Sequence, residues 1–192
     1  MDNQDFNSDI DKAVQILRAG GLILYPTDTV WGIGCDACSP EAVSKVYALK
    51  RRSDSKALIT LVADVPSLQK WLHEVPAGIE KIIDGADRPV TVIFDGARNL
   101  AHNLTAADGS IGLRVTREAY SAELCRRLGR PVVSTSANIS GQPTARFFGE
   151  ISPEVISGCD YVARYRRDDT TPSKPSRIIR LFSDGTIKTI RP

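Results

Sequence analysis

The chain has 192 residues, of which 42% are hydrophobic and 25% are charged, as in a globular protein with a single core. The formal net charge of +2 is too small to indicate a nucleic-acid partner by itself. No apolar run approaches the ~20 residues of a membrane span, and the polar, acidic residues 1–11 argue against a signal peptide. We therefore expect one domain over residues 1–192, in the cytoplasm and without membrane contact.

The cysteines and histidines exclude two common kinds of site. Cys35 and Cys38 form a lone C-x-x-C pair, and no second pair or nearby histidine completes a zinc site. The two histidines, His73 and His102, lie in no nucleophile motif, which argues against a Ser-His-Asp hydrolase. We expect reduced, mostly buried thiols and no metal held by the protein.

The chain begins with a predicted helix. Apolar residues recur at helical spacing at Ile10, Ala13, Val14 and Leu17. Ser8 has the position of an N-cap, and Gly20 and Gly21 end the pattern.

A buried strand follows over residues 22–25 and stops at Pro26, because proline cannot donate to a sheet ladder. Thr27, Asp28 and Thr29 come next, ahead of two glycines at positions 32 and 34. We expect this polar segment to form a loop at the carboxyl end of the strand, where α/β proteins build their sites. An ordinary strand-to-loop turn is the alternative.

Ser39 and Pro40 predict the start of a second helix, which runs through residues 41–49. The densest basic segment of the chain, residues 50–56, follows and leads into a buried strand over residues 57–62. A run of charges is usually a solvated surface, but this run lies between the end of a helix and the start of a strand.

Helical segments are expected over residues 65–72 and 78–83, and strands over 90–94 and 111–115. The last of these strands carries Arg114 among apolar residues, where a cation is costly without a partner. Its partner is either an internal carboxylate or an anionic ligand, and the sequence favours neither.

A helix over residues 119–128 ends at Gly129 and precedes a short strand over 131–133. This strand leads into a loop of hydroxyls and an amide, residues 134–141, whose donors suit a phosphate or a carboxylate. A turn without a ligand is the alternative. Residues 168–175 indicate a mobile loop, and residues 176–190 predict a hairpin.

Strands alternate with helices early in the chain and form a hairpin late, which predicts one α/β domain with a mixed, twisted sheet. No complete glycine fingerprint for phosphate is present, since Gly32 and Gly34 lack a third glycine and a P-loop is absent.

Three stretches in this order resemble the YrdC-domain family, the threonylcarbamoyl-AMP synthases. They are residues 25–32 (Tyr-Pro-Thr-Asp-Thr-Val-Trp-Gly), the Lys50-x-Arg52 segment, and residues 134–138 (Ser-Thr-Ser-Ala-Asn). The resemblance extends from about Ile16 to Arg191. It implies a mixed, twisted open sheet with flanking helices and a deep basic cavity, and an enzyme that joins L-threonine, bicarbonate and ATP. A partner transferase would then move the threonylcarbamoyl group to tRNA.

The resemblance also implies roles for individual residues. It places L-threonine at Thr29, Arg114, Ser134 and Ser176. It places ATP at Arg52, Lys56, Ser110, Ser136, Asn138, Thr144 and Arg191. Lys50 and Arg52 would be the catalytic pair, and Mg²⁺ would bridge the ATP phosphates. Arginine forks suit carboxylates and phosphates, and adenylation by positioning and charge needs no general base.

The sequence departs from the family in two places and leaves two other functions open. Arg88 stands where many relatives have glycine, and Leu61 where some have histidine. The chain ends at Pro192, without the additional carboxyl-terminal domain of longer members. The alternative functions are binding of double-stranded RNA or tRNA, and another nucleotide-dependent activity on the same fold. The arginines available for an RNA surface are Arg126, Arg127, Arg130, Arg164, Arg166 and Arg167.

Overall fold

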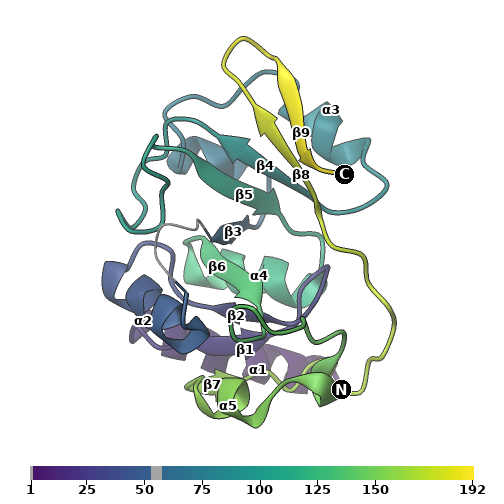
Figure 1. The fold of residues 1–192 in the computed structure, drawn as a ribbon. Coiled ribbons are helices and arrows are strands. Elements are labelled where there is room, and N and C mark those ends of the chain that lie inside the picture. Colours follow the sequence, from purple (N-terminus) through teal and green to yellow (C-terminus); the bar gives the residue numbers. More distant parts are fainter. Residues whose placement is uncertain (1, 53–57) are drawn as a thin grey trace.

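The computed structural model describes residues 2–52 and 58–192, which form an α/β fold around a mixed sheet (Figure 1). The helices are α1 Asn3–Arg18, α2 Pro40–Lys50, α3 Ile79–Asp84, α4 Ala119–Leu128 and α5 Pro153–Ser157, with short 3₁₀ turns at Pro66–Lys70 and Phe148–Glu150. The strands are β1 Ile23–Tyr25, β2 Gly32–Gly34, β3 Ile59–Val62, β4 Val90–Phe94, β5 Ile111–Val115, β6 Val132–Ser136, β7 Tyr161–Val162, β8 Arg177–Leu181 and β9 Ile187–Arg191.

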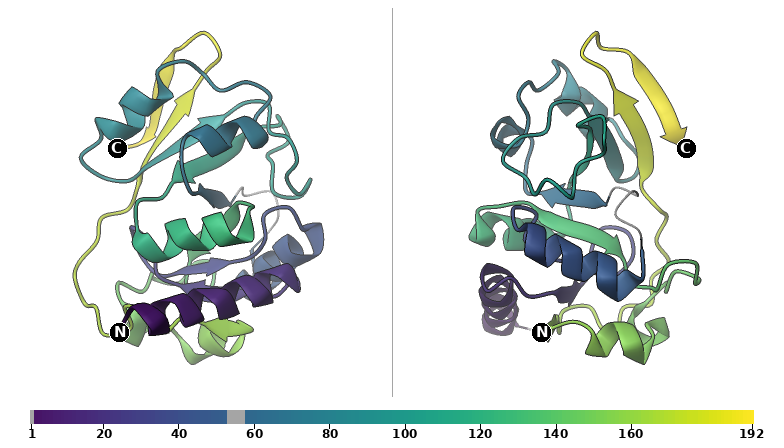
Figure 2. Two further views of the ribbon diagram at one scale, coloured as in Figure 1. Left: turned by 180° about the vertical axis from the view of Figure 1, so that it is seen from behind. Right: turned by 60° about the vertical axis from the view of Figure 1, so that its left-hand side comes forward.

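The strands pair in the order β7-β1-β2-β6-β3-β5-β4-β8-β9. The sheet contains both parallel pairs, such as β3 with β5, and antiparallel pairs, such as β3 with β6, so the predicted mixed sheet is confirmed. Helices α1 and α4 lie side by side when the molecule is seen from behind (Figure 2, left). The hairpin of β8 and β9 stands at the opposite end of the molecule from the N-terminus (Figure 1).

Most predicted elements lie where the sequence places them. Ser39 caps α2 by accepting the N–H of Ala42 at 3.2 Å, and Gly129 ends α4 in the left-handed conformation with φ 72°. The strands at 90–94 and 111–115 are β4 and β5, and the late hairpin is β8 with β9. The predicted strand at 57–62 is described from residue 58 onward. The expected loop at 168–175 contains no helix or strand.

The predicted start of the first helix is wrong. Helix α1 begins at Asn3, and its N-cap is Asp2, whose carboxylate accepts the N–H of Asp5 at 2.8 Å. Phe6 extends the apolar side of the helix by one turn, because its ring packs edge-on against Tyr120 and Tyr165. Ser8 therefore lies inside the helix.

Two strand segments were not predicted from the sequence: residues 32–34 were assigned to no element, and residues 134–136 were expected to begin a loop. Residues 32–34 form β2, and residues 134–136 continue β6, so that Gly32 pairs with Ser136 and Ile33 with Thr135. Gly34 is required by packing, since a Cβ there would lie 2.6 Å from the ring of Tyr25 and 2.7 Å from the carbonyl oxygen of Val133. The loop between β1 and β2, which carries Thr27, Asp28 and Thr29, agrees with the prediction.

The described residues contain no helix long and apolar enough to cross a bilayer.

Candidate active site

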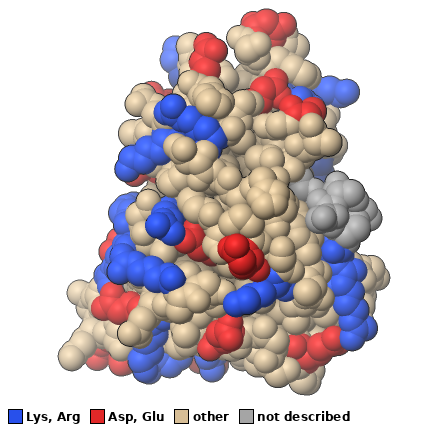
Figure 3. All heavy atoms as spheres, turned by 90° about the vertical axis from the view of Figure 1, so that its left-hand side faces the viewer, with Lys and Arg blue, Asp and Glu red and all other residues tan. Residues whose placement is uncertain are grey.

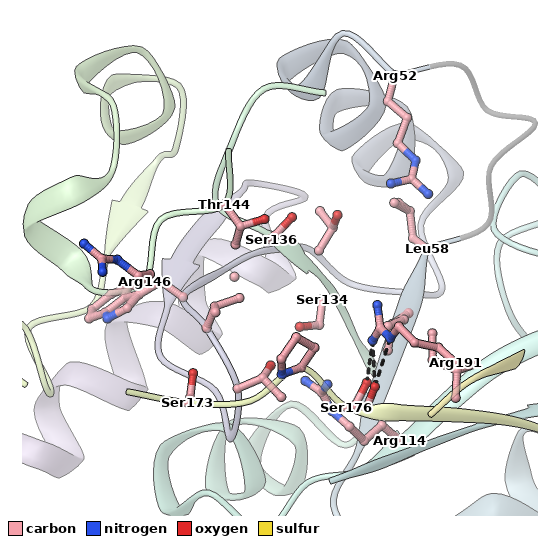
Figure 4. A pocket seen from close by; sticks show the side chains of 18 residues that line it. Arg52, Leu58, Arg114, Ser134, Ser136, Thr144, Arg146, Ser173, Ser176 and Arg191 are labelled. Atoms are coloured by element: carbon pink, nitrogen blue, oxygen red, sulfur yellow. Dashed lines mark hydrogen bonds between the residues drawn. The ribbon is translucent and has the colours of Figure 1, made fainter. Parts of the chain in front are cut away.

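A cavity of about 510 Å³ opens among the ends of several strands, within the size range of small-molecule sites (Figure 4). Its polar lining comes from segments far apart in the sequence. These residues are Thr29, Arg52, Arg114, Ser134, Thr135, Ser136, Thr144, Arg146, Ser173, Ser176 and Arg191. Hydroxyls and guanidinium groups dominate, so the lining suits an anionic or hydroxyl-bearing ligand.

The loop between β1 and β2 is held by its own hydroxyls. Thr27 Oγ1 donates to the carbonyl of Val30 at 2.7 Å and accepts the backbone N–H of Thr29 at 3.1 Å. The two threonine hydroxyls lie 3.1 Å apart. Trp31, which also lines the cavity, packs on Phe148 with ring centroids 4.9 Å apart. Thr29 is thereby fixed on the cavity wall.

Arg114 satisfies both sequence-based interpretations at once. Its Nη2 lies 3.1 Å from Oδ1 of Asp28, and the two side chains are only 4% and 10% exposed. Arg114 also lines the cavity, and its buried Nε has no hydrogen-bond partner among the described residues. Burial raises the pKa of Asp28, and the positive charge of Arg114 opposes that rise. Arg114 therefore has an internal carboxylate partner and also forms part of the cavity wall.

The end of β6 contributes three consecutive hydroxyl-bearing residues to the cavity wall, Ser134, Thr135 and Ser136. Ser134 and Ser136 lie on the same face of the strand. Ser136 Oγ donates to Oδ1 of Asn138 at 2.5 Å, and the amide of Asn138 donates to the carbonyl of Gln142 at 2.8 Å. Asn138 thus supports Ser136 from behind and does not line the cavity itself.

Arg191 reaches the cavity from the last strand, close to Arg114 in Figure 4. Its guanidinium donates to the carbonyl of Ser176 at 2.8 Å and 3.1 Å, and to the Ser176 hydroxyl at 3.2 Å. That hydroxyl also lies 3.0 Å from Oγ1 of Thr91. Burial lowers the pKa of Arg191, and the positive charges of Arg114 and Arg88 lower it further. Cationic side chains thus gather at one side of the cavity, which favours an anion there.

Most of the predicted site residues meet at this cavity: Thr29, Arg52, Arg114, Ser134, Ser136, Thr144, Ser176 and Arg191. Three others lie outside its lining. Lys50 is buried at the end of α2, Asn138 lies behind Ser136, and Ser110 donates to Asp108 at 2.6 Å. Lys56 lies outside the described residues. Leu61 is fully buried in the core.

Sequence reasoning missed Trp31, Arg146 and Ser173 as lining residues. Trp31 lies in the motif at residues 25–32, so the motif could have indicated that Trp31 belongs to the site. Arg146 forms an ion pair with Glu150 and lies over the ring of Phe147. No motif in the sequence pointed to Arg146 as a site residue. Ser173 belongs to the polar stretch that predicted a loop.

The arginines considered for an RNA surface are mostly paired within the protein. All except Arg167 have a carboxylate within 4.0 Å, for example Asp36 at 2.7 Å from Arg130 and Asp11 at 2.7 Å from Arg127. Arg167 donates to the carbonyls of Ala163 and Val162. On the face in Figure 3, acidic and basic side chains are interspersed. The distribution of charge therefore does not single out a basic surface there.

The donor set does not fit a magnesium ion held by the protein. The described part of the cavity wall offers hydroxyls and guanidinium groups but no carboxylate. Among the described residues, no three His, Cys, Asp or Glu side chains are grouped as metal ligands.

Comparison with known proteins decides the family. The Sua5/YciO/YrdC family model, whose description reads "Telomere recombination", matches residues 15–192. The chain belongs to this family. A protein of Stenotrophomonas maltophilia named threonylcarbamoyl-AMP synthase is 37% identical over 155 residues, which cover 77% of this chain and 81% of that protein. One of the same name from Coxiella burnetii is 32% identical over 162 residues, covering 80% and 87%.

Solved structures of the family share the fold. A P. abyssi Sua5 structure, complexed with L-threonine, superposes with a TM-score of 0.83 at 22% identity. The match covers 95% of this chain and 53% of that one, so the chain spans about half the length of that protein. E. coli YciO superposes with a TM-score of 0.80 at 24% identity, covering 95% and 87%. At these identities the likeness establishes the fold alone.

Proposed function

We propose that this protein is a threonylcarbamoyl-AMP synthase that joins L-threonine, bicarbonate and ATP. Its curated relatives carry that name, and the chain belongs to the family that its sequence motifs resemble. The observation that carries the proposal is the cavity wall, where hydroxyls stand beside the guanidinium groups of Arg52, Arg114 and Arg191. A planar guanidinium pairs well with a carboxylate such as that of threonine.

The two substrates take different parts of the cavity. L-threonine binds near Arg114, with Thr29, Ser134 and Ser176 orienting its polar groups. ATP binds along Arg52, Ser136, Thr144 and Arg191, and Lys56 joins this group by resemblance. Guanidinium groups and hydroxyls neutralise and position the phosphates. Asn138 supports Ser136, and Ser110 remains an ATP contact by resemblance only.

The reaction needs positioning and charge stabilisation more than proton transfer. The amine of threonine condenses with bicarbonate to a carbamate, with loss of water. A carbamate oxygen then attacks the α-phosphorus of ATP, a bond to that phosphorus forms, and pyrophosphate leaves with the bonding electrons of the broken P–O bond. The arginines stabilise the charge that develops on the phosphates. Mg²⁺, for which the described part of the cavity wall offers no carboxylate, enters as part of the ATP substrate.

The product is an activated acyl donor, so a second reaction must transfer the acyl group to an acceptor. We propose that a separate transferase passes the threonylcarbamoyl group to adenosine in tRNA, and that both act in the cytoplasm. Direct binding of double-stranded RNA or tRNA by this chain is the alternative function. It draws no support from the surface arginines, because most of them are paired with carboxylates.

Pyrophosphate release from ATP tests the proposal. We expect release that requires both L-threonine and bicarbonate and that falls when either is omitted. Arg52→Gln should raise the KM for ATP by on the order of ten- to a hundredfold, since it removes a charge-assisted contact. Arg51→Gln is the matched control, because Arg51 is 68% exposed and pairs with Glu154 away from the cavity. Release independent of threonine would favour another nucleotide-dependent activity, and no release together with tight RNA binding would favour the RNA-binding function.

A further inference from the structure

Lys50 is a buried lysine whose ammonium group contacts backbone. It is the last residue of α2 and only 2% exposed. Its Nζ donates to the carbonyl of Ser136 at 2.5 Å and to the carbonyl of Asn138 at 2.7 Å. These contacts lie behind the cavity wall, and Lys50 is absent from the lining. The ammonium therefore acts on the wall rather than on a ligand in the cavity.

The backbone of Lys50 adds a third contact to the same segment. Its carbonyl accepts the N–H of Ser140 at 2.9 Å. One residue thus binds the segment 136–140 at both ends and in the middle. This segment leaves the sheet directly after Ser136, where pairing with Gly32 ends. On one side the N–H of Ala137 still donates to the carbonyl of Trp31 at 3.0 Å, and Lys50 supplies donors to the carbonyls of Ser136 and Asn138.

The energetic cost of Lys50 indicates that the contact has a purpose. No carboxylate pairs with its ammonium among the described residues, and burial with the nearby charge of Arg52 lowers its pKa to about 8. A buried cation is tolerated when hydrogen bonds replace its hydration, and the two carbonyls supply them. An apolar side chain would avoid this cost but would remove a donor from both carbonyls, leaving that of Ser136, among the described residues, only the N–H of Asn138 at 2.8 Å.

We propose that Lys50 is a positioning residue that fixes the segment 136–140, so that Ser136 presents its hydroxyl to the ATP side of the cavity. The proposal builds on the proposed function. Ser134, two residues earlier, is held differently, because β6 pairs there with Ile59 of β3. Removing the ammonium should therefore disturb Ser136 and leave Ser134 in place.

Lys50→Met tests the proposal in two independent ways. In spectra of the ligand-free protein, the backbone amide signals of residues 137–140 should shift and exchange faster with solvent, while those of residues 132–134 stay unchanged. In the pyrophosphate assay, the KM for ATP should rise by on the order of ten- to a hundredfold, with the KM for threonine within about twofold and kcat reduced far less. Lys50→Gln keeps an N–H donor, so its amide shifts and its KM for ATP should lie between those of wild type and Lys50→Met.

Lys45→Met is the matched control. Lys45 lies on the same helix, and its ammonium donates to the carbonyl of Gly20 at 2.7 Å in an exposed setting. It should change neither the amide signals nor either KM.

Several outcomes would overturn the proposal. They are unchanged amide signals in Lys50→Met, an equal rise in both KM values, or a loss confined to kcat, which would make Lys50 catalytic. If wild type shows no threonine-dependent turnover, the proposed function fails while the amide signals still test the contact. If neither Lys50 variant folds, the contact can be tested in the wild-type protein by the exchange of its ammonium protons. Its Lys50 ammonium protons should exchange slowly and lie close to the backbone of Ala137, and fast exchange would refute the contact.

Discussion

The buried pair of Asp28 and Arg114 offers the sharpest test of how the site is built. Arg114→Met keeps a long side chain but removes the guanidinium, leaving Asp28 in a site where its carboxylate is 10% exposed. Breaking a buried pair from one side typically costs about 3–5 kcal/mol, because the remaining charge is uncompensated. We therefore expect a large loss of stability in addition to the loss of threonine binding.

Protonation of Asp28 limits that loss and makes it depend on pH. A carboxyl with an ordinary unfolded pKa of about 3.9 is neutralised at pH 7 for about 4 kcal/mol and at pH 5 for about 1.5 kcal/mol. The unpaired charge cannot cost more than its neutralisation. Burial already raises the pKa of Asp28 in the wild type, and losing Arg114 raises it further. For a carboxyl with a raised folded pKa, stability is present at low pH and is lost as pH rises through that pKa.

Urea unfolding between pH 5 and pH 8 measures this effect. The deficit of Arg114→Met relative to wild type should be at most about 4 kcal/mol at pH 7 and at most about 1.5 kcal/mol at pH 5, because the wild type already bears part of the cost. The double variant Asp28→Asn with Arg114→Met should recover most of the stability and lose the pH dependence, yet still fail to use threonine. A deficit below about 1 kcal/mol at pH 7, or one that does not change with pH, would refute this account.

Three further predictions concern the hydroxyls and one glycine. Ser134→Ala should raise the KM for threonine and Ser136→Ala the KM for ATP, each by about threefold to tenfold; equal effects on both substrates would contradict the division of the cavity. Thr29→Val, which keeps the branched shape, should lower kcat/KM for threonine by on the order of ten- to a hundredfold with an unchanged Tm, and wild-type turnover would remove Thr29 from the site. Gly34→Ala should cost about 1–3 kcal/mol in urea unfolding, because its Cβ would lie 2.6 Å from an aromatic carbon; Gly112→Ala, with its nearest atom at 3.6 Å, is the control and should cost clearly less.

The elements that could be predicted are those with local signals. Ser39 before Pro40 marks the start of α2, and Gly129 marks the end of α4, because caps and left-handed glycines act within a few residues. Apolar runs likewise located β4 and β5. The missed first turn of α1 depends on Phe6 meeting Tyr120, a contact between residues that the sequence does not bring together.

The strand segments that were not predicted depend on tertiary pairing. Glycines and serines have low strand propensity, so residues 32–34 and 134–136 carry no strand signal. They form strands because each pairs with the other, Gly32 opposite Ser136, and because Gly34 allows close approach to Tyr25. The candidate site has the same origin. Motifs identified most of its polar residues, but only the fold could separate Lys50, behind the wall, from Arg52, on it.

Under the proposed function, the two substrates would meet parts of the cavity wall that are built differently. Ser134 lies within the ladder between β6 and β3, and Arg114 lies on a central strand and is paired with Asp28. Ser136 is the last residue of β6 and, in the described part of the chain, pairs only with Gly32 of β2, and the side chains of Asn138 and the buried Lys50 add hydrogen bonds to it. A ladder is cooperative with the whole sheet, whereas a turn held by a few side-chain bonds opens locally at lower free energy. The ATP side of the cavity should accordingly be the part that adjusts during turnover, while the threonine side stays fixed and sets specificity.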